Sequence, residues 1–409
     1  MKIAMAILAE EARTKGKERA VHLRVGELDG KIYFDLGDAL GHVVEIGPEE
    51  WRVTTDSPVV FRHPEGMRRL PVPIKDPTAR DQLRGLVNLP CPDDFDLYVA
   101  WLLGSMYASG PYPILGVISQ PGFGKSWLSR IAREIIDPNY APIRGMPKNE
   151  HDFIIAAANS WVIAMDNLTS IPDWFGDALC RLSTGGGFAA RRLYSDDEQI
   201  LFNVQRPAIL TGVEAFLTRA DLLDRAIVLE PPAFRPGERR PEAELLKEFR
   251  KAHAGILGWL FSVLAGALGI QDMFTPEDLP RMADFAARIA ACEPFFLSSR
   301  RGQFARIYEG NRHQTDQVSI DASPVGRYLV ELGNLGNWTG SASALLRTLA
   351  QRAGSIETRA KSWPQTPHAL SLQVRRIQPC LQACGLQITF SREAGGNRDR
   401  LITLFRRPQ

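Results

Sequence analysis

The sequence predicts an α/β fold built around a parallel sheet. Apolar strands alternate with helical segments between residues 113 and 229, and a glycine-containing loop joins the first of these strands directly to a helix. Such alternation is typical of βαβ units, in which the strands run parallel. The predicted strands are Pro113–Ser119, Trp161–Met165, Ala208–Thr211 and Ala226–Leu229, with helices at Gly124–Ile136 and Pro172–Ser183.

The segments on either side of this core have a different character. Residues 20–65 contain short strands between Gly, Asp and Pro turns, which predicts a small β-rich domain that ends in the proline-punctuated linker Met67–Asp76. A helix is expected over Asp93–Ser109, and the chain is helix-rich over Glu242–Glu309. We therefore expect four domains: 1–87, β-rich with its linker; 88–235, the core; 236–320, a helical lid or connector; and 321–409.

The last of these domains has the element order of a winged helix. Three helices are followed by two strands joined by a glycine-containing turn. The third helix contains Pro379, which we expect to kink it. The expected elements are Val325–Leu332, Ala342–Ala353, Ala369–Cys384, Leu386–Phe390 and Leu401–Phe405.

The composition is that of a globular protein with a substantial core. Of its 409 residues, 44% are hydrophobic and 23% are charged, which excludes a disordered chain, a collagen-like rod and a disulfide miniprotein. The five cysteines form no CxxC pair and are expected to be buried thiols. The apolar run Met1–Ala9 is short for a secretion signal, and Ala254–Ile270 is expected to be a buried helix. These features predict a cytoplasmic protein without a membrane partner.

The charge is distributed unevenly along the chain. The net charge is only +2, but residues 321–409 contain twelve Lys and Arg against five Asp and Glu. A basic module on a mildly acidic body indicates a polyanion partner at that end.

The strongest motif is the segment from Ser119 to Ser126, SQPGFGKS, between a predicted strand and a predicted helix. This is the context of a P-loop, in which backbone N–H groups cradle the phosphates of a nucleotide, Lys125 reaches the β- and γ-oxygens and Ser126 binds Mg²⁺. Ser119 stands where the motif usually has glycine. The predicted nucleotide contacts are Ser119, Gln120, Pro121, Gly122, Phe123, Gly124, Lys125, Ser126 and Trp127.

Asp166 follows the next core strand and has the position of a Walker B aspartate, which holds Mg²⁺ beside the P-loop. The following residue is Asn167, where many such ATPases carry a glutamate that orients the attacking water. Either Asp166 performs both functions, or Asp173 or Asp177 from the next helix assists. Thr211 ends a third strand and could position the water.

The arrangement of these motifs resembles the ATP-binding, helicase-like proteins of bacteriophages and integrative elements, which are related to superfamily 3 helicases and the AAA+ class. The matching segments lie between about residues 88 and 235 and include QPGFGKS, WVIAMDN, STGGGFAARRLY, RPAILTG and DLLDRAIVL. The resemblance implies an ATP-hydrolysing ring, a hexamer, that moves on DNA. It also implies Thr211 as a sensor and Arg225 as an arginine finger; the alternative for Arg225 is a surface ion pair with Asp224.

Two regions are candidates for DNA contact. In the predicted hairpin Phe188–Val204, Arg191 and Arg192 could bind phosphates of single-stranded DNA and Tyr194 could stack on a base. The acidic tip Ser195–Glu198 argues against this and leaves a role at the ATP site or the subunit interface open. In the winged helix, the candidates for duplex contact are Arg375, Arg376, Arg392, Arg398 and Arg400.

The sequence thus predicts an ATP-driven replicative helicase or translocase of a mobile element. Three alternatives remain at this point: a helicase loader or initiator that assembles on DNA without unwinding it, an ATPase of an anti-phage system, and a P-loop protein that remodels other proteins.

Overall fold

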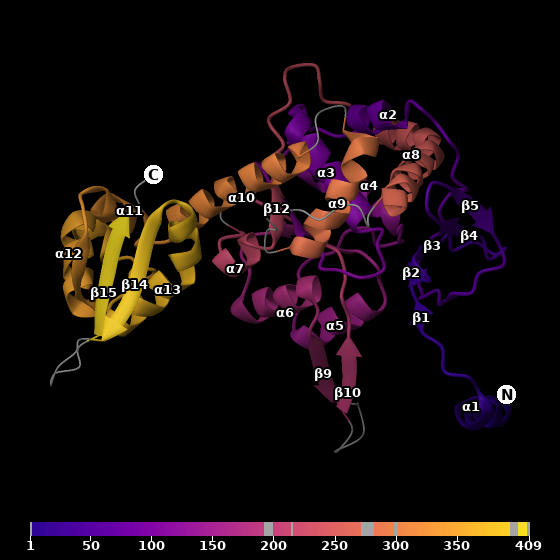
Figure 1. Ribbon diagram of the computed structural model, residues 1–409, viewed down its shortest axis with the longest axis horizontal. Helices are drawn as coiled ribbons and strands as arrows, with labels where there is room; N and C mark the ends of the chain where they lie inside the picture. Colours follow the sequence, from indigo (N-terminus) through magenta and orange to yellow (C-terminus); the bar gives the residue numbers. More distant parts are fainter. Residues whose placement is uncertain are drawn as a thin grey trace.

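The computed structural model describes residues 2–191, 199–213, 216–270, 282–297, 302–392 and 400–406. Its centre is a four-stranded parallel sheet in the order β12-β7-β11-β8. The edge strand β12 is labelled in Figure 1. The strands are β7 (Ile114–Ile118), β8 (Ile163–Leu168), β11 (Ala208–Gly212) and β12 (Ala226–Leu229). The predicted α/β class with a parallel sheet is confirmed.

Both faces of this sheet are covered, which explains why its strands are continuous apolar runs rather than alternating ones. Successive side chains point to opposite faces of a strand. Leu115 and Val117 belong to the core shared with helices on one face, whereas Ile114 and Ile118 belong to the core on the other. The first face carries α3 (Pro92–Gly104) and α4 (Lys125–Ile136), and the second carries α5 (Glu150–Ala158), α6 (Asp173–Thr184) and α7 (Ala220–Leu223).

The N-terminal region is an antiparallel meander in the order β2-β3-β4-β5, beside a short parallel pair of β1 with β6. It packs on the long helix α8 (Glu242–Ile270): the Phe34 and Phe261 rings lie 5.2 Å apart, and the Trp51 indole donates to Ser262 Oγ at 2.9 Å. The elements are α1 (Lys2–Lys15), β1 (Val21–His22), β2 (Val25–Leu28), β3 (Lys31–Asp35), β4 (Val43–Ile46), β5 (Trp51–Thr54) and β6 (Val60–Phe61).

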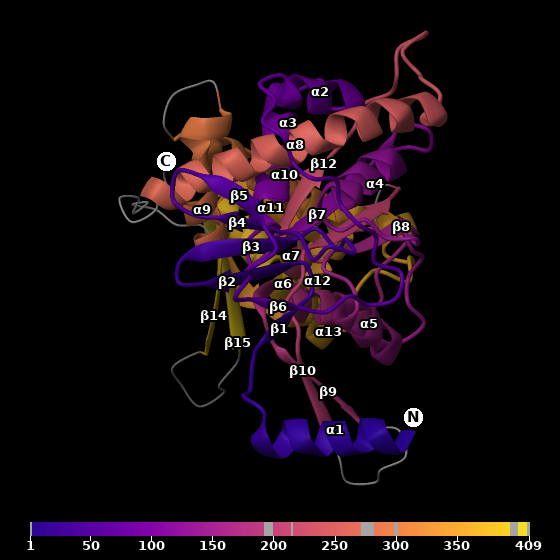
Figure 2. The same ribbon diagram turned by 90° about the vertical axis from the view of Figure 1, so that its right-hand side faces the viewer.

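Helix α8 is the one helix in the described part of the chain that is long and apolar enough to cross a membrane. However, 61% of its most apolar window is buried inside the protein. It contacts α2 (Ala79–Leu86), α9 (Ala283–Phe296) and the N-terminal strands, as expected for a core helix (Figure 2). The prediction of a buried helix over Ala254–Ile270 is confirmed.

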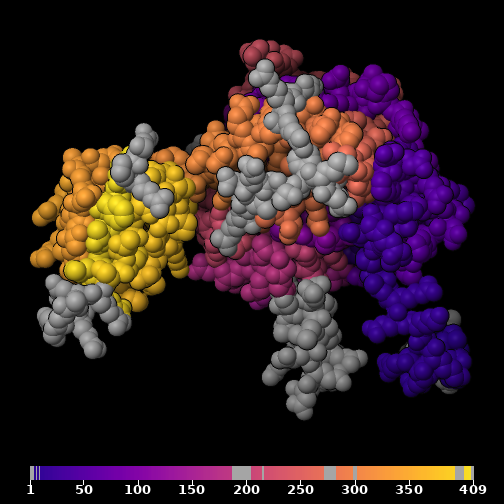
Figure 3. All heavy atoms as spheres, viewed as in Figure 1, coloured from indigo at the N-terminus to yellow at the C-terminus, as the bar shows by residue number. Residues whose placement is uncertain are grey.

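The C-terminal region forms a lobe beside the body, reached through α10 (Gln303–Ala322) (Figures 1 and 3). The buried Glu293 carboxylate caps the start of α10 by accepting from the backbone N–H of Gln303 at 2.6 Å. The lobe has its own apolar core. Its elements are α11 (Gly326–Asn334), β13 (Trp338–Ser341), α12 (Ala342–Glu357), α13 (Pro367–Ala383), β14 (Leu386–Arg392) and β15 (Arg400–Arg406), with the strands antiparallel in the order β13-β15-β14.

A hairpin of β9 (Gly187–Arg191) and β10 (Gln199–Asn203) projects from the body, as the sequence predicts (Figure 1). One prediction about the thiols is wrong. Cys91 is exposed, because it immediately precedes α3 at the surface, whereas Cys292 and Cys380 are buried and Cys180 and Cys384 are partly buried.

Candidate functional site

The loop between β7 and α4 has the backbone geometry that a phosphate-binding loop requires. Gly122 and Gly124 have φ angles of 87° and 89°, in the left-handed region that favours glycine. The first helical residue after Gly124 is Lys125, so the free N–H groups of α4 point into the loop. Ser119 N–H donates to Gly212 O at 3.3 Å, which ties the loop to the end of the neighbouring strand β11.

Lys125 is buried beneath this loop. Its ammonium donates to Ser119 O at 3.1 Å, and the residue is 8% exposed. Among the described contacts it has no carboxylate partner. An ammonium has three N–H donors, and a single carbonyl oxygen leaves part of this hydrogen-bonding capacity unused. Such a buried cation is suited to receive an anion.

The polar residues predicted from the strand ends meet at the carboxyl edge of the sheet. Ser126 Oγ donates to Asp166 Oδ1 at 3.0 Å, and Thr211 Oγ1 donates to the same oxygen. Ser126 is the second residue of α4, Asp166 lies near the end of β8, and Thr211 lies near the end of β11. A hydroxyl and a carboxylate oxygen are ligands that Mg²⁺ prefers, so this pair fits the ion in the way a P-loop site uses it.

The backbone is irregular where β8 and β11 end. Asn167 has a φ of 58°, and the pairing of β8 with β11 shifts register between Leu210 and Gly212. Asn tolerates the left-handed region better than most residues. This conformation lets Asn167 N–H donate to Thr211 Oγ1 at 3.3 Å. The strand therefore runs through Leu168 rather than ending at Met165, and Asp166 and Asn167 are part of it.

Neither Asp173 nor Asp177 lies with this cluster. Asp177 pairs with the Arg219 guanidinium at 2.6 Å, and Asp173 lies 3.6 Å from the same side chain. Arg219 also binds Asp221, and the carboxylates of Asp221 and Asp177 raise its pKa. Both aspartates are therefore engaged in an ion-pair network on α6 and α7, and the carboxylate beside the P-loop is that of Asp166.

A cavity of about 870 Å³ opens next to the P-loop. Part of its lining comes from Pro121, Gly122, Gly124, Lys125 and Ser126 of the P-loop, together with Asp166 and Asn167. The rest of the lining comes from residues 84–90, Trp127, Phe234 and Leu245, together with the charged residues Glu238, Arg239, Arg240 and Glu242. The predicted contact Trp127 belongs to this lining, and its indole donates to Leu86 O at 2.8 Å. The cavity thus combines the P-loop and Asp166 with apolar, aromatic and charged side chains.

Sequence reasoning missed the side chains that close this cavity. Asn88 Nδ2 donates to Phe123 O at 3.0 Å and to Pro232 O at 2.8 Å, and Arg239 donates to Gly122 O at 2.8 Å. No motif marks Asn88. For Arg239, the one signal in the sequence is the pair Arg239–Arg240, which follows Pro231–Pro232 after the last core strand.

A second cavity of about 440 Å³ lies beside Asp166 and Asn167, along residues 143–146 and 168–170.

Arg225 lies at the opposite edge of the sheet from the P-loop. It precedes Ala226, which pairs with Ile114 at the start of β7, whereas the P-loop follows Ile118. Four strand residues separate the two edges by about 13 Å. The Arg225 guanidinium donates to Asp221 O at 2.6 Å, and its buried Nε has no hydrogen-bond partner among the described residues. Arg225 is thus remote from the P-loop of its own chain.

The arginines of α13 form an exposed basic surface on the C-terminal lobe. Arg375 and Arg376 are both exposed, and the Arg375 guanidinium stacks over the Phe390 ring at 3.8 Å. Arg400 is exposed at the start of β15. Arg392 ends β14, and its side chain lies outside the described part of the structure, as does that of Arg191 in β9. Arg192, Tyr194 and Arg398 lie outside the described residues.

Comparison with known families identifies the chain. Residues 80–296 match the family of actinomycete integrative conjugative element replication proteins, and residues 325–409 match the C-terminal domain of the RepA proteins of these elements. The first match spans more than half of the chain. The chain belongs to this replication protein family. The predicted resemblance to integrative-element proteins is therefore confirmed, while no curated protein matches the chain.

Several solved structures are similar to this replication protein at low identity. One is described as the active helicase Cch of SCCmec type IV, with 11% identity, a TM-score of 0.48 and coverage of 98% of this chain and 82% of that one. Another is the C-terminal region of NrS-1, with 12% identity, a TM-score of 0.38 and coverage of 89% of this chain and 93% of that one. A third is a full-length MCM homologue from Methanopyrus kandleri, with 12% identity, a TM-score of 0.35 and coverage of 75% of this chain and 73% of that one. At these scores the similarities say nothing about activity.

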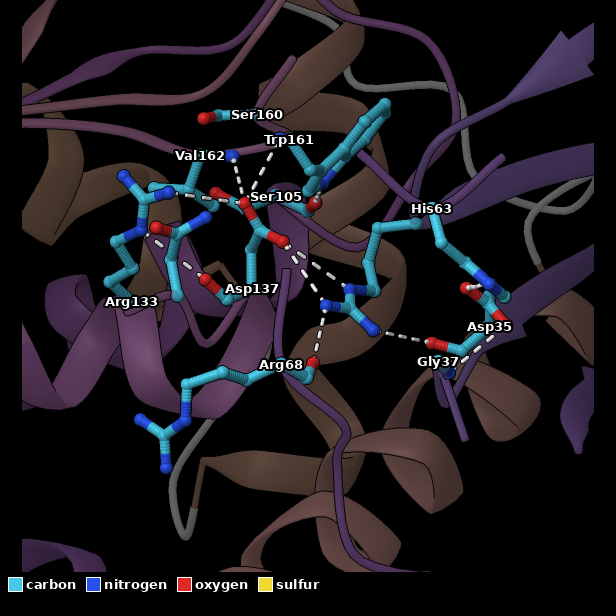
Figure 4. Close-up of polar contacts among 12 residues, drawn as sticks. Asp35, Gly37, His63, Arg68, Ser105, Arg133, Asp137, Ser160, Trp161 and Val162 are labelled. Atoms are coloured by element: carbon cyan, nitrogen blue, oxygen red, sulfur yellow. Dashed lines mark hydrogen bonds and ion pairs between the residues drawn. The ribbon is translucent and has the colours of Figure 1, made fainter. Parts of the chain in front are cut away.

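In the replication protein, a buried ion-pair cluster holds the elements that carry the site (Figure 4). Asp137 follows α4, and its Oδ2 accepts from the backbone N–H groups of Trp161 and Val162 at 3.0 and 3.2 Å, just before β8. Its Oδ1 accepts from the fully buried Arg24 guanidinium, which lies 3.3 Å away. Burial lowers the pKa of Arg24, and the charge of Asp137 opposes this effect.

Through Asp137, this cluster connects the two elements that carry the site residues. Helix α4 begins with Lys125 and Ser126, and Asp166 and Asn167 lie near the end of β8. Asp137 therefore joins the far ends of both elements. Through Arg24 it also anchors the N-terminal β region to them, because Arg24 further donates to Asp35 O at 3.1 Å.

Proposed function

We propose that this replication protein is an Mg²⁺-dependent ATPase that moves on DNA as a mobile-element replicative helicase. The observation that carries the proposal is the convergence of the Lys125 ammonium, the Ser126 hydroxyl and the Asp166 carboxylate at the amino-terminal end of α4. These groups supply what phosphoryl transfer needs: charge neutralisation at the β- and γ-phosphates and fixed positions for the reacting oxygens.

Each side chain has a distinct part in the proposed reaction. Lys125 neutralises the β- and γ-phosphate oxygens, and Ser126 and Asp166 would hold Mg²⁺. When bound, that ion supplies further neutralisation of phosphate charge. Thr211, which is fully buried and bonded to both Asp166 and Asn167 N–H, orients the attacking water. Asp166 accepts the proton of that water, because Asp173 and Asp177 are engaged by Arg219.

The proposed enzyme is a ring, with a hexamer as the expected size. Arg225 supports this assembly, since a side chain at the far edge of the sheet can contribute to hydrolysis only in the site of a neighbouring subunit. In such a ring, the projecting β9–β10 hairpin would contact single-stranded DNA in the channel.

The C-terminal lobe is proposed to be a winged helix that binds duplex DNA, with α13 as the helix that enters the groove. The exposed Arg375 and Arg376 on α13 and Arg400 on the strand pair support this role. The proposed domains are 1–87, 88–235 for the ATPase core, 236–320 for the helical connector, and 321–409 for the winged helix. The family matches at 80–296 and 325–409 are compatible with the last boundary.

Replacing these arginines should weaken DNA binding in two different ways. We expect Arg376→Gln to reduce sequence preference if this side chain reaches base edges, whereas Arg400→Gln should weaken binding to all sequences alike. Removal of one arginine that neutralises a phosphate should reduce the slope of log affinity against log salt by about 0.9. The measurement is a salt titration of the full chain on duplex DNA, with the exposed α8 residue Arg250 changed to Gln as the control. A flat salt dependence in the unaltered chain would contradict a DNA-binding lobe.

The function is tested by ATP hydrolysis measured with and without single-stranded DNA, combined with strand displacement on a forked duplex. Stimulated hydrolysis with displacement supports the helicase. ATP-dependent assembly on DNA without displacement would identify a loader or initiator. Stimulation by a protein partner and not by DNA would identify a remodelling or defence ATPase.

A further inference from the structure

The segment from Glu230 to Pro241, which we call the strap, crosses beside the P-loop between β12 and α8. Two side-chain bridges join it to the loop. Asn88 Nδ2 donates both to Phe123 O and to Pro232 O, at 3.0 and 2.8 Å. From the strap itself, Arg239 donates to Gly122 O at 2.8 Å. The strap therefore forms one wall of the nucleotide cavity.

The three arginines of the strap differ in their partners. Arg235 pairs with Glu238, with 3.9 Å between Nε and Oε1, and Arg240 pairs with Glu244 at 2.9 Å and with Glu248. Arg239 instead contacts a carbonyl oxygen of the P-loop and lies 6.0 Å from the centroid of the Phe234 ring. Within the described contacts, Arg239 has no carboxylate partner. A guanidinium has five N–H donors, so most of those on Arg239 remain for a ligand.

Arg239 lies directly against the part of the loop that would cradle phosphates. A Cβ atom placed on Gly122 would lie 2.7 Å from Arg239 Nη2. The guanidinium and Lys125 line the same cavity, the lysine from beneath the loop and the arginine from the strap. A guanidinium can donate two parallel hydrogen bonds to a phosphate group, and such charge-assisted bonds are stronger than one to a neutral carbonyl.

We propose that Arg239 is a phosphate ligand that closes the strap over a bound nucleoside triphosphate. On binding, its guanidinium exchanges the Gly122 carbonyl for oxygens of the terminal phosphate. The site then selects triphosphates over diphosphates through a charge supplied by the strap. This inference rests on the proposed ATPase function and adds to it a residue outside the P-loop and strand motifs.

The test compares equilibrium binding of MgATP and MgADP to the full chain and three variants by titration calorimetry. Arg239→Gln should raise the Kd for ATP about 10- to 100-fold, as expected when charge-assisted hydrogen bonds are removed, and the Kd for ADP much less. Arg239→Lys should recover part of the ATP affinity, because it restores the charge without the paired donors. Arg235→Gln is the matched control, an exposed arginine of the same strap, and should bind ATP as the unaltered chain does.

A second readout follows the strap in the unaltered chain. Trypsin does not cleave before proline, so the Arg239–Arg240 bond is the one site in this strap that it can cut. ATP should protect this bond, and AMP should not. Equal Kd values for ATP in Arg239→Gln and the unaltered chain, with no protection by ATP, would overturn the proposal while leaving the ATPase intact. Failure of the unaltered chain itself to bind MgATP would overturn both the ATPase and this inference.

Discussion

Lys125→Ala should reduce ATP turnover about 10³-fold or more, the scale on which charge clamps contribute to phosphoryl transfer. The ammonium is buried beneath the P-loop with a carbonyl oxygen as its contact, and it is one of only ten lysines in the chain. Its replacement removes the charge that meets the β- and γ-phosphates. The measurement is steady-state release of phosphate at saturating MgATP.

Two controls separate this effect from a loss of folding. Lys247→Ala removes an exposed lysine from α8 and should leave turnover unchanged. The thermal unfolding midpoint of Lys125→Ala should remain close to that of the unaltered chain, because its buried ammonium gives up one hydrogen bond to a carbonyl. Turnover that persists in a folded Lys125→Ala protein would contradict the proposed site.

Arg225→Ala should bind ATP normally but hydrolyse it about 10³-fold more slowly or worse, as expected for loss of an arginine finger. The residue lies at the far edge of the sheet from its own P-loop, so in the proposed ring it would act on hydrolysis in a neighbouring subunit. Mixing experiments test this directly. An equal mixture of Arg225→Ala and Lys125→Ala subunits should recover about one quarter of the ATPase activity of the unaltered ring. In a randomly assembled ring, about one interface in four places an intact site against an intact arginine.

The matched control is an equal mixture of Lys125→Ala subunits and Asp166→Asn subunits. Both of these changes damage the site of their own subunit, so no interface in that mixed ring is complete and no activity should return. Equal activity in the two mixtures, or normal hydrolysis by Arg225→Ala alone, would contradict action in trans.

The parts of the site that the sequence predicts are those encoded by local pattern. A strand, a glycine turn and a helix are continuous in sequence, so Lys125 and Ser126 could be placed without knowledge of the rest. Asp166 and Thr211 follow apolar runs, and parallel strands bring such carboxyl ends together, as the Ser126–Asp166 and Thr211–Asp166 hydrogen bonds show.

The remaining features depend on tertiary contacts that no local pattern encodes. Asn88 and Arg239 reach the P-loop from segments on either side of the core. Asp137 looks like an ordinary helix-ending residue in the sequence, yet it joins α4, β8 and Arg24. Strand β13 has only four residues, and it is completed by pairing with the distant β15. Helix α1, whose Met5, Ile7 and Leu8 are exposed, also escaped prediction.

The most direct test of a DNA-stimulated ATPase is the rate of ATP hydrolysis by the full chain, with Mg²⁺, in the presence and absence of single-stranded DNA. We expect measurable hydrolysis that DNA stimulates, that chelation of Mg²⁺ abolishes and that Lys125→Ala lacks. A purified, folded chain that hydrolyses no ATP under either condition, or hydrolyses it at one rate regardless of DNA, would contradict a DNA motor.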